Sequence, residues 1–169
     1  MIPKEKVKYF APALLFLLLL IDGQLTMGAE TLLDNAYYPS AHFLLLVYLL
    51  LIPNLSKRYV IISSLIIGLI CDSYYLGVLG IYTVALVSTV MLMYTFQGIV
   101  ETNIPTAFFG MVIFVTSYEL IAVALQVIFH LSKVGPITFV TRVLGPTLLF
   151  NMLIFVLFFY PLKRLLSTK

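Results

Sequence analysis

Charged side chains are scarce in this chain. Asp, Glu, Lys and Arg make up only 10% of its 169 residues, whereas apolar residues make up 62%. Soluble globular domains ordinarily contain about a quarter charged and about half apolar residues. The composition therefore argues against a soluble protein and predicts an integral membrane protein. Because each crossing of a ~30 Å hydrocarbon core needs about 20 residues, the chain has room for five or six helices and for no soluble domain.

Cysteine is nearly absent too, as are the motifs of common catalytic sites. Cys71 is the only cysteine, so no disulfide can form within the chain, and its apolar neighbours favour inert packing. The sequence contains no Gly-rich phosphate loop, no zinc-type His/Glu pair, no nucleophile elbow and no paired carboxylates on one helical turn. We therefore expect no enzymatic activity, no cofactor and no metal.

Internal repeats and clustered basic residues are also missing. The absence of an evident repeat weakens the case for a transporter built from inverted repeats. Lys and Arg are too few on any one face to bind nucleic acid, and contact with the headgroups of membrane lipids is a simpler role for them.

Six apolar segments are predicted to form a single polytopic membrane domain over residues 1–169, an all-α bundle of six transmembrane helices. The spans lie at about 9–27, 37–53, 59–72, 78–97, 106–130 and 137–160. No convincing cleavage site follows the first span, so we expect it to remain uncleaved. Pro39 suits the first turn of the second helix, and Pro53 suits its end. Gly145 and Pro146 interrupt the last segment, which is either one kinked helix or a short interfacial helix followed by a span.

The distribution of basic residues predicts the orientation in the membrane. Short cytoplasmic loops collect Lys and Arg, and six crossings place both termini in the cytoplasm. On that model most basic residues are cytoplasmic, namely Lys4, Lys6, Lys8, Lys57, Arg58, Lys163, Arg164 and Lys169. Only Lys133 and Arg142 lie on or near the outer side. Five crossings would put the C-terminal basic pair outside, which the same rule disfavours.

One carboxylate, Asp72, lies among glycines and tyrosines between the third and fourth spans. An acid at membrane depth costs on the order of 2.5 to 3.5 kcal/mol on insertion scales, so it is a functional candidate. The apolar part of the third helix is about 13 residues, or roughly 20 Å, which places Asp72 in the outer leaflet. Asp72 or Ser73 could cap a new turn through Tyr74 and Tyr75, while Gly77 and Gly80 allow tight turning. The alternative is that Asp72 engages a partner or ligand directly.

A second group of polar residues lies on the fifth helix. Glu119, Gln126 and His130 fall within about 40° of one another at 100° per residue, so they form one stripe that faces the bundle or a partner. Arg142 is a candidate counter-ion for Glu119 or Asp72. The simpler interpretation is hydrogen bonding between helices. Two further polar candidates lie elsewhere: Asp22, which we expect to border solvent, and Asn151, which we expect to join helices.

Several of these features together resemble the bacterial rod shape-determining protein MreD family, over the whole chain. The resemblance rests on Gly68-Leu-Ile-Cys-Asp72 followed by Leu79-Gly80, on Tyr38-Pro39 and Pro53 around the second helix, and on Gly145-Pro146 with Asn151 before a basic end. The chain departs from the family in Ser73-Tyr74-Tyr75, where an aliphatic residue more commonly follows the acid. The resemblance implies a bundle similar to the S-components of energy-coupling-factor transporters.

The same resemblance implies a non-enzymatic scaffold of the bacterial plasma membrane that binds MreC. It would work with RodA and its transpeptidase partner in the peptidoglycan synthesis of cell elongation. Such a scaffold would receive a partner helix near Gly68, Asp72, Tyr75, Gly77 and Gly80. The alternative is a substrate-binding subunit of a vitamin-type transporter, with an outward pocket lined by Asp22, Asp72, Glu119 and Gln126. The scarcity of polar groups favours the scaffold.

Overall fold

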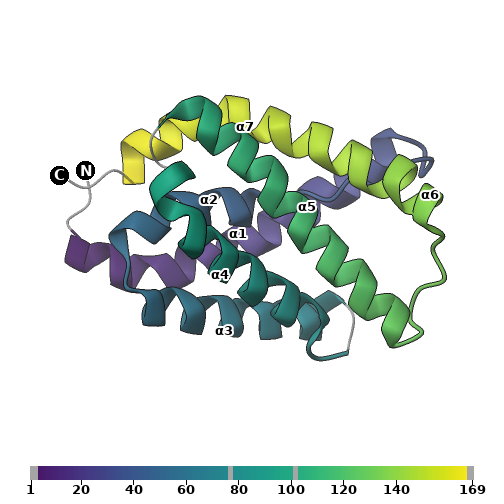
Figure 1. The fold of residues 1–169 in the computed structure, drawn as a ribbon, viewed down its shortest axis with the longest axis horizontal. Coiled ribbons are helices and arrows are strands. Elements are labelled where there is room, and N and C mark those ends of the chain that lie inside the picture. Colours follow the sequence, from purple (N-terminus) through teal and green to yellow (C-terminus); the bar gives the residue numbers. More distant parts are fainter. Residues whose placement is uncertain (1–3, 76–77, 101–102, 167–169) are drawn as a thin grey trace.

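A computed structural model describes residues 4–75, 78–100 and 103–166 of the chain, and within these ranges it contains helices and no strand. The helices are α1 (Lys4–Leu32), α2 (Phe43–Leu51), α3 (Lys57–Tyr75), α4 (Ile81–Val100), α5 (Ile104–Ile128), α6 (Pro136–Thr138) and α7 (Gly145–Leu166) (Figure 1). A 3-10 turn, η1 (Ile52–Asn54), extends α2, and a π turn, η2 (Phe139–Leu144), joins α6 to α7.

Within the described ranges, four helical segments are long and apolar enough to cross a membrane: Ala11–Leu32, Ile81–Val100, Ile104–Ile128 and Pro136–Leu165. The apolar stretch Phe43–Asn54 is shorter. The 19 residues of α3 correspond to about 28 Å of helix, close to the thickness of the hydrocarbon core. The protein is thus an all-helical membrane protein, and many large apolar side chains on its outside are exposed, as a lipid-facing surface requires.

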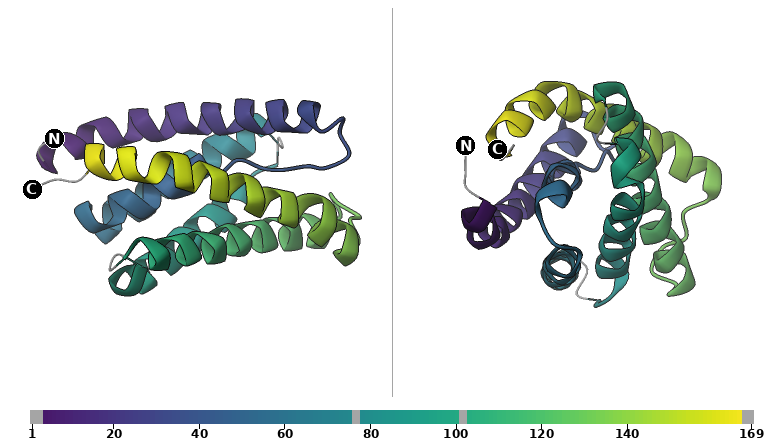
Figure 2. Two further views of the ribbon diagram at one scale, coloured as in Figure 1. Left: turned by 90° about the horizontal axis from the view of Figure 1, so that it is seen from above. Right: turned by 60° about the vertical axis from the view of Figure 1, so that its left-hand side comes forward.

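The helices run back and forth between two ends of an elongated bundle (Figures 1 and 2). The first described turn of α1 and the last described turn of α7 lie at the same end. We call this the terminal end and the opposite one the loop end. The loop end holds the end of α1, the end of α5 and α6.

The core of the bundle forms around α2. Eight of its nine residues are buried, and the helix packs against α1, α4, α5 and α7. Its sequence is apolar on every side, and a helix of that kind is stable only when other helices surround it. The helices α3 and α4 pack side by side along their lengths.

The structure corrects the prediction of a helix over 37–53. Residues 37–42, which we call the pre-α2 segment, are not helical, and α2 begins at Phe43. Pro39 therefore lies before the helix and not in its first turn. A residue that precedes proline is sterically disfavoured in the helical conformation, so Tyr38 in the Tyr38-Pro39 pair opposes an earlier start.

Other boundaries also differ from the predicted spans. The first span extends over Lys4–Leu32, and the third continues through Asp72 to Tyr75, so Asp72 is inside a helix. The fifth helix ends at Ile128, before His130, whose backbone has a φ of 57°. That left-handed conformation cannot continue a right-handed helix, so His130 leaves the predicted stripe.

Of the two alternatives predicted for the last segment, the structure has the single continuous helix. Pro136–Leu165 is helical throughout, and the π turn η2 lies immediately before Gly145 and Pro146. Proline has no N–H for the carbonyl four residues before it, which here belongs to Arg142. The N–H of Tyr38 donates to that carbonyl at 2.8 Å. Pro146 therefore leaves the carbonyl of Arg142 free to accept a hydrogen bond from the pre-α2 segment.

Candidate functional site

The carboxylate of Asp72 is fully buried between α3 and α4. It accepts hydrogen bonds from the N–H groups of Gly80 (2.7 Å), Tyr82 (2.7 Å) and Thr83 (3.1 Å), and from the hydroxyl of Thr83 (2.6 Å). These N–H groups belong to the start of α4, where no carbonyl within the helix can accept them and where the helix dipole favours negative charge. Asp72 therefore caps the next helix across the interface.

This arrangement differs from the predicted local cap. The helix α3 continues through Tyr74, so no new turn begins there, and the hydroxyl of Ser73 donates to the carbonyl of Leu69 in its own helix. Of the other residues predicted near Asp72, Tyr75 ends α3 but its side chain lies outside the described residues, as does Gly77.

Two glycines complete the contact between α3 and α4. A Cβ atom on Gly68 would lie 2.6 Å from the Cα atom of Thr83, so the two helices can approach this closely only without a side chain there. Gly80 has a φ of +114°, a conformation that other residues rarely adopt. Gly68, Asp72 and Gly80 thus form one structural unit with Thr83, which we call the α3–α4 clasp.

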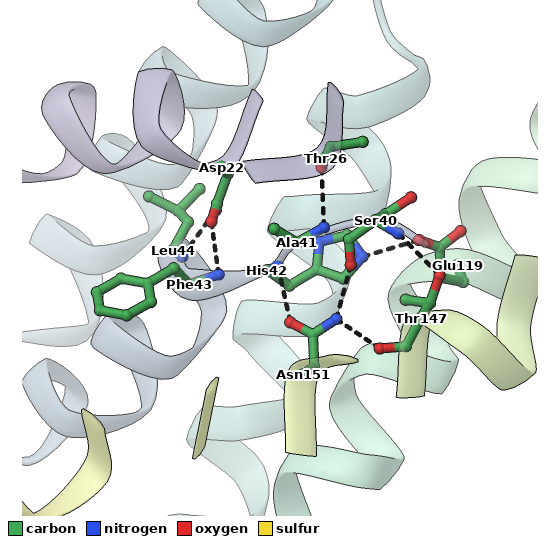
Figure 3. A network of polar contacts seen from close by, with 10 residues as sticks. All are labelled: Asp22, Thr26, Ser40, Ala41, His42, Phe43, Leu44, Glu119, Thr147 and Asn151. Carbon is green, nitrogen blue, oxygen red and sulfur yellow. Dashed lines mark hydrogen bonds and ion pairs between the residues drawn. The ribbon is translucent and has the colours of Figure 1, made fainter. Parts of the chain in front are cut away.

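A second buried carboxylate performs the same task for α2. Asp22 of α1 accepts the N–H groups of Phe43 (2.7 Å) and Leu44 (2.9 Å), the first two residues of α2 (Figure 3). One turn further along α1, the hydroxyl of Thr26 accepts the N–H of Ala41 at 2.9 Å. Asp22 is only 9% exposed, so it is a buried cap and does not border solvent as predicted.

The last helix holds the pre-α2 segment from its other side. Asn151 is fully buried and accepts the N–H of His42 at 2.7 Å, while its amide donates to the carbonyls of Ser40 (2.7 Å) and Thr147 (2.8 Å). The hydroxyl of Thr147 accepts the N–H of Ser40 at 3.0 Å. Asn151 joins two distant segments, as its predicted role requires. Irregular backbone inside a membrane needs such partners, because lipid offers none.

A buried pair of ionisable side chains lies beside these contacts. The Nε2 atom of His42 is 2.8 Å from Oε1 of Glu119 on α5, and both side chains are about nine-tenths buried (Figure 3). The ring of Tyr118 packs edge-on against His42 at 4.7 Å, and its other neighbour, Tyr82, is parallel to it at 6.3 Å. Sequence reasoning identified Glu119 but missed His42, whose only local signal was its position just before an apolar helix.

Arg142 does not fill the role predicted for it. Its side chain is exposed, and in the described part of the chain it pairs with neither Glu119 nor Asp72. Beside Glu119, His42 occupies the position expected for Arg142, and N–H groups at the start of α4 surround Asp72.

The pre-α2 segment and the pair His42–Glu119 border a cavity of about 440 Å³ at the loop end of the bundle. Three of the four residues predicted to line an outward pocket do line it: Asp22, Glu119 and Gln126. Asp72 does not, because its carboxylate is enclosed by α4, and neither does His130. Among the residues that the structure describes, no three His, Cys, Asp or Glu side chains are grouped closely enough to hold a metal ion.

The comparison with protein-family models identifies a family for this chain. The family model of the rod shape-determining protein MreD matches residues 4–169, essentially the whole chain. No curated protein and no solved structure matches it, so the similarity to transporter S-components stays a prediction. The match agrees with the apolar helices and implies a role in rod shape determination. The chain belongs to the rod shape-determining protein MreD family.

Proposed function

We propose that the protein is a non-enzymatic scaffold of the cell-elongation machinery in the bacterial plasma membrane and that it binds MreC. RodA and its transpeptidase partner would belong to the same assembly. The observation that carries this proposal is the family match over residues 4–169.

The use of the buried polar groups supports a scaffold. Asp22, Asp72, Thr147 and Asn151 are each directed at backbone groups of a neighbouring segment. Side chains used in this way fix the shape of the bundle and leave its outer surface to apolar contacts. We propose six crossings with both termini in the cytoplasm, since α1 begins and α7 ends at the same end of the bundle.

The outward face of α3 is our candidate surface for the MreC helix. Gly68 and Asp72 contact α4 and are not available to a partner helix, so we place the partner on the exposed face of the same helix, formed by Ile62, Ile66 and Leu69. These side chains are between 39% and 58% exposed and follow the i, i+4, i+7 spacing of one helix face. The helix α7 offers a matched face, with Leu149, Leu153 and Val156 at the same spacing and 62% to 72% exposed.

The test uses one central substitution on each face. We expect Ile66→Trp to lower the amount of MreC that copurifies from bacterial membranes at least five-fold, because added bulk displaces a packed helix. Leu153→Trp should leave recovery unchanged, and both variants should accumulate at normal levels. Loss of MreC with Leu153→Trp alone would place the surface on α7. Wild-type protein that recovers no MreC would overturn the scaffold proposal.

The cavity supports a second candidate function, the substrate-binding subunit of a small-molecule transporter. Its lining includes three of the residues predicted for such a pocket, Asp22, Glu119 and Gln126. Mass spectrometry of protein purified from membranes separates the two functions. Recovery of a stoichiometric vitamin-like molecule without MreC would favour transport over the scaffold.

A further inference from the structure

The cavity at the loop end has the size and construction of a small-molecule site. Its volume of about 440 Å³ lies within the roughly 300–1,000 Å³ of typical ligand pockets. Its walls come from α1, the pre-α2 segment, α2, α3, α4, α5, the segment after α5 and η2. Much of the lining is apolar, with Leu19, Leu45 and Leu86 among its residues.

The charges on the cavity wall are one-sided. Three carboxylates line it, those of Asp22, Glu30 and Glu119, whereas no Lys or Arg side chain does so in the described part of the chain. Among the described lining residues His42 is the one basic side chain, and it already contacts Glu119. The carboxylate of Asp22 already accepts hydrogen bonds from the N-terminal N–H groups of α2. An anionic ligand would therefore meet repulsion, and a cationic one would meet attraction.

Two lining side chains retain acceptor atoms that the described residues do not use. The side chain of Glu119 is about nine-tenths buried, yet only Oε1 is hydrogen-bonded, and Oε2 has no partner among the described residues. In the described part of the chain, Thr89 Oγ1 is the one fully enclosed side-chain polar atom that lacks a partner. Glu119 Oε2 also lacks a partner, so it is not fully enclosed. It is therefore open to the cavity. The side-chain amide of Gln126, two turns along α5, likewise lines the cavity without a protein partner among the described residues.

Aromatic side chains lie beside these acceptors. Tyr82 and Tyr118 both line the cavity, and their rings are stacked with an interplanar angle of 4°. The face of an aromatic ring attracts a cation within about 6 Å of its centre. A carboxylate oxygen, an amide and aromatic rings in an otherwise apolar cavity form a complementary set for an organic ammonium group.

We propose that this cavity binds a small organic cation, in which an ammonium group on an aromatic or apolar body contacts Glu119 Oε2. The ammonium N–H groups donate to Glu119 and Gln126, and the body packs between the tyrosines and the leucine-lined wall. The proposal is independent of MreC binding, because it concerns the loop-end cavity and not the outward face of α3. Its failure would leave the scaffold intact.

Binding is measured by calorimetry on the full chain in lipid nanodiscs that contain only phosphatidylglycerol. The probes are tryptamine and tryptophol, which share an indole body and differ in ammonium against hydroxyl. We expect tryptamine to bind at least ten-fold more tightly than tryptophol. We also expect Glu119→Gln to weaken tryptamine binding at least ten-fold. Equal binding of the two probes, no measurable tryptamine binding, or an unchanged affinity in Glu119→Gln would overturn the proposal.

Asp34→Asn is the matched control. Asp34 is an exposed acid outside the cavity lining, and its φ of 50° suits asparagine equally well. The Asp34→Asn variant should bind tryptamine as tightly as the wild type does. Weakened binding by this variant would show a general charge effect and overturn the proposed site. If Glu119→Gln does not fold, Val123→Phe decides, since Val123 lines the cavity and added bulk fills it. Unchanged tryptamine affinity in a folded Val123→Phe variant would overturn the proposal.

The ammonium group has two natural sources, a free amine or the headgroup of phosphatidylethanolamine. Adding phosphatidylethanolamine to the nanodiscs separates them. A headgroup that occupies the cavity reduces the apparent tryptamine affinity in proportion to its mole fraction. An unchanged affinity assigns the cavity to a free amine.

Discussion

At the scale of single residues, two acids carry the same structural task. Asp22 and Asp72 are both buried in a membrane bundle, where an uncompensated carboxylate is unfavourable. Each is instead surrounded by N–H groups at the first turn of the helix that follows, α2 for Asp22 and α4 for Asp72. The chain thus uses a carboxylate of one helix to start the next.

Asp72→Asn should destabilise the protein by about 1–3 kcal/mol, the usual penalty for buried donors that lose their acceptor. An amide offers one acceptor oxygen where the carboxylate offers two, and its NH₂ group faces other donors. Unfolding in mixed micelles with increasing dodecyl sulfate measures the change. The exposed Asp34→Asn provides the control, and equal stability of both variants would contradict the importance of the α3–α4 clasp.

Gly68→Ala tests the close contact within the same clasp. The added methyl group would lie 2.6 Å from a backbone atom of Thr83, so the helices must separate, which typically costs about 1–3 kcal/mol. Gly98→Ala adds the same methyl group on α4 with no neighbour within 4 Å. It should be neutral or raise the stability by up to about 1 kcal/mol. A melting temperature that is the same for both variants would show that the helices separate without cost.

The roles of some of these residues could be predicted from the sequence, and those of others could not. Gly68, Asp72 and Gly80 lie within thirteen residues, so their association could be predicted from spacing even though the direction of the cap could not. His42 had no such signal, because its partner Glu119 is 77 residues away. His42, and not Arg142, lies beside Glu119 because of the course of the pre-α2 segment, which no local pattern encodes.

At the scale of elements, the second membrane segment combines the irregular pre-α2 segment with the short helix α2. The prediction of a full helix over 37–53 followed the apolar pattern, which identifies burial but not backbone conformation. Pro39 was expected in the first turn of the helix, and this was wrong, since α2 begins only at Phe43 and Tyr38 donates to Arg142 on another helix. Helix boundaries here depend on side chains of α1 and α7.

Thr147→Val should loosen the pre-α2 segment without changing the helix content. Valine matches threonine in shape but offers no acceptor for the N–H of Ser40. Hydrogen–deuterium exchange of peptides that cover residues 37–42 should therefore accelerate. Thr95→Val is the control, since the exposed Thr95 hydroxyl bonds only to Met91 in its own helix. Equal exchange in both variants would mean that Thr147 does not hold the segment.

At the scale of the whole molecule, composition was sufficient to predict an all-helical membrane protein, and a few motifs were sufficient to predict the family. For the cavity, the sequence predicted only three of the lining residues, Asp22, Glu119 and Gln126. Its shape arises from helices that are far apart in sequence. Asp22 caps α2 and lines the cavity, whereas Asp72 caps α4 and does not.

The proposed topology predicts the accessibility of introduced cysteines. Cys71 is buried and gives little background, and Cys71→Ser removes it. On that background, Lys133→Cys at the loop end should react with a membrane-impermeant maleimide in intact spheroplasts. Ser56→Cys, between α2 and α3, should react only after permeabilisation. The reverse pattern would invert the orientation, and labelling of both in intact cells would contradict six crossings.

The hydrogen bonds between the pre-α2 segment and α7 also constrain the order in which the chain can be completed. Thr147 and Asn151 follow the backbone groups they hold by 107 to 111 residues. Synthesis proceeds from the N-terminus, so the second segment is made long before its acceptors exist. Until the ribosome has released α7, Ser40 and His42 must keep their amides near water or lipid headgroups. Contacts of the pre-α2 segment are thus completed only after α7, which follows it by more than 100 residues, has been made.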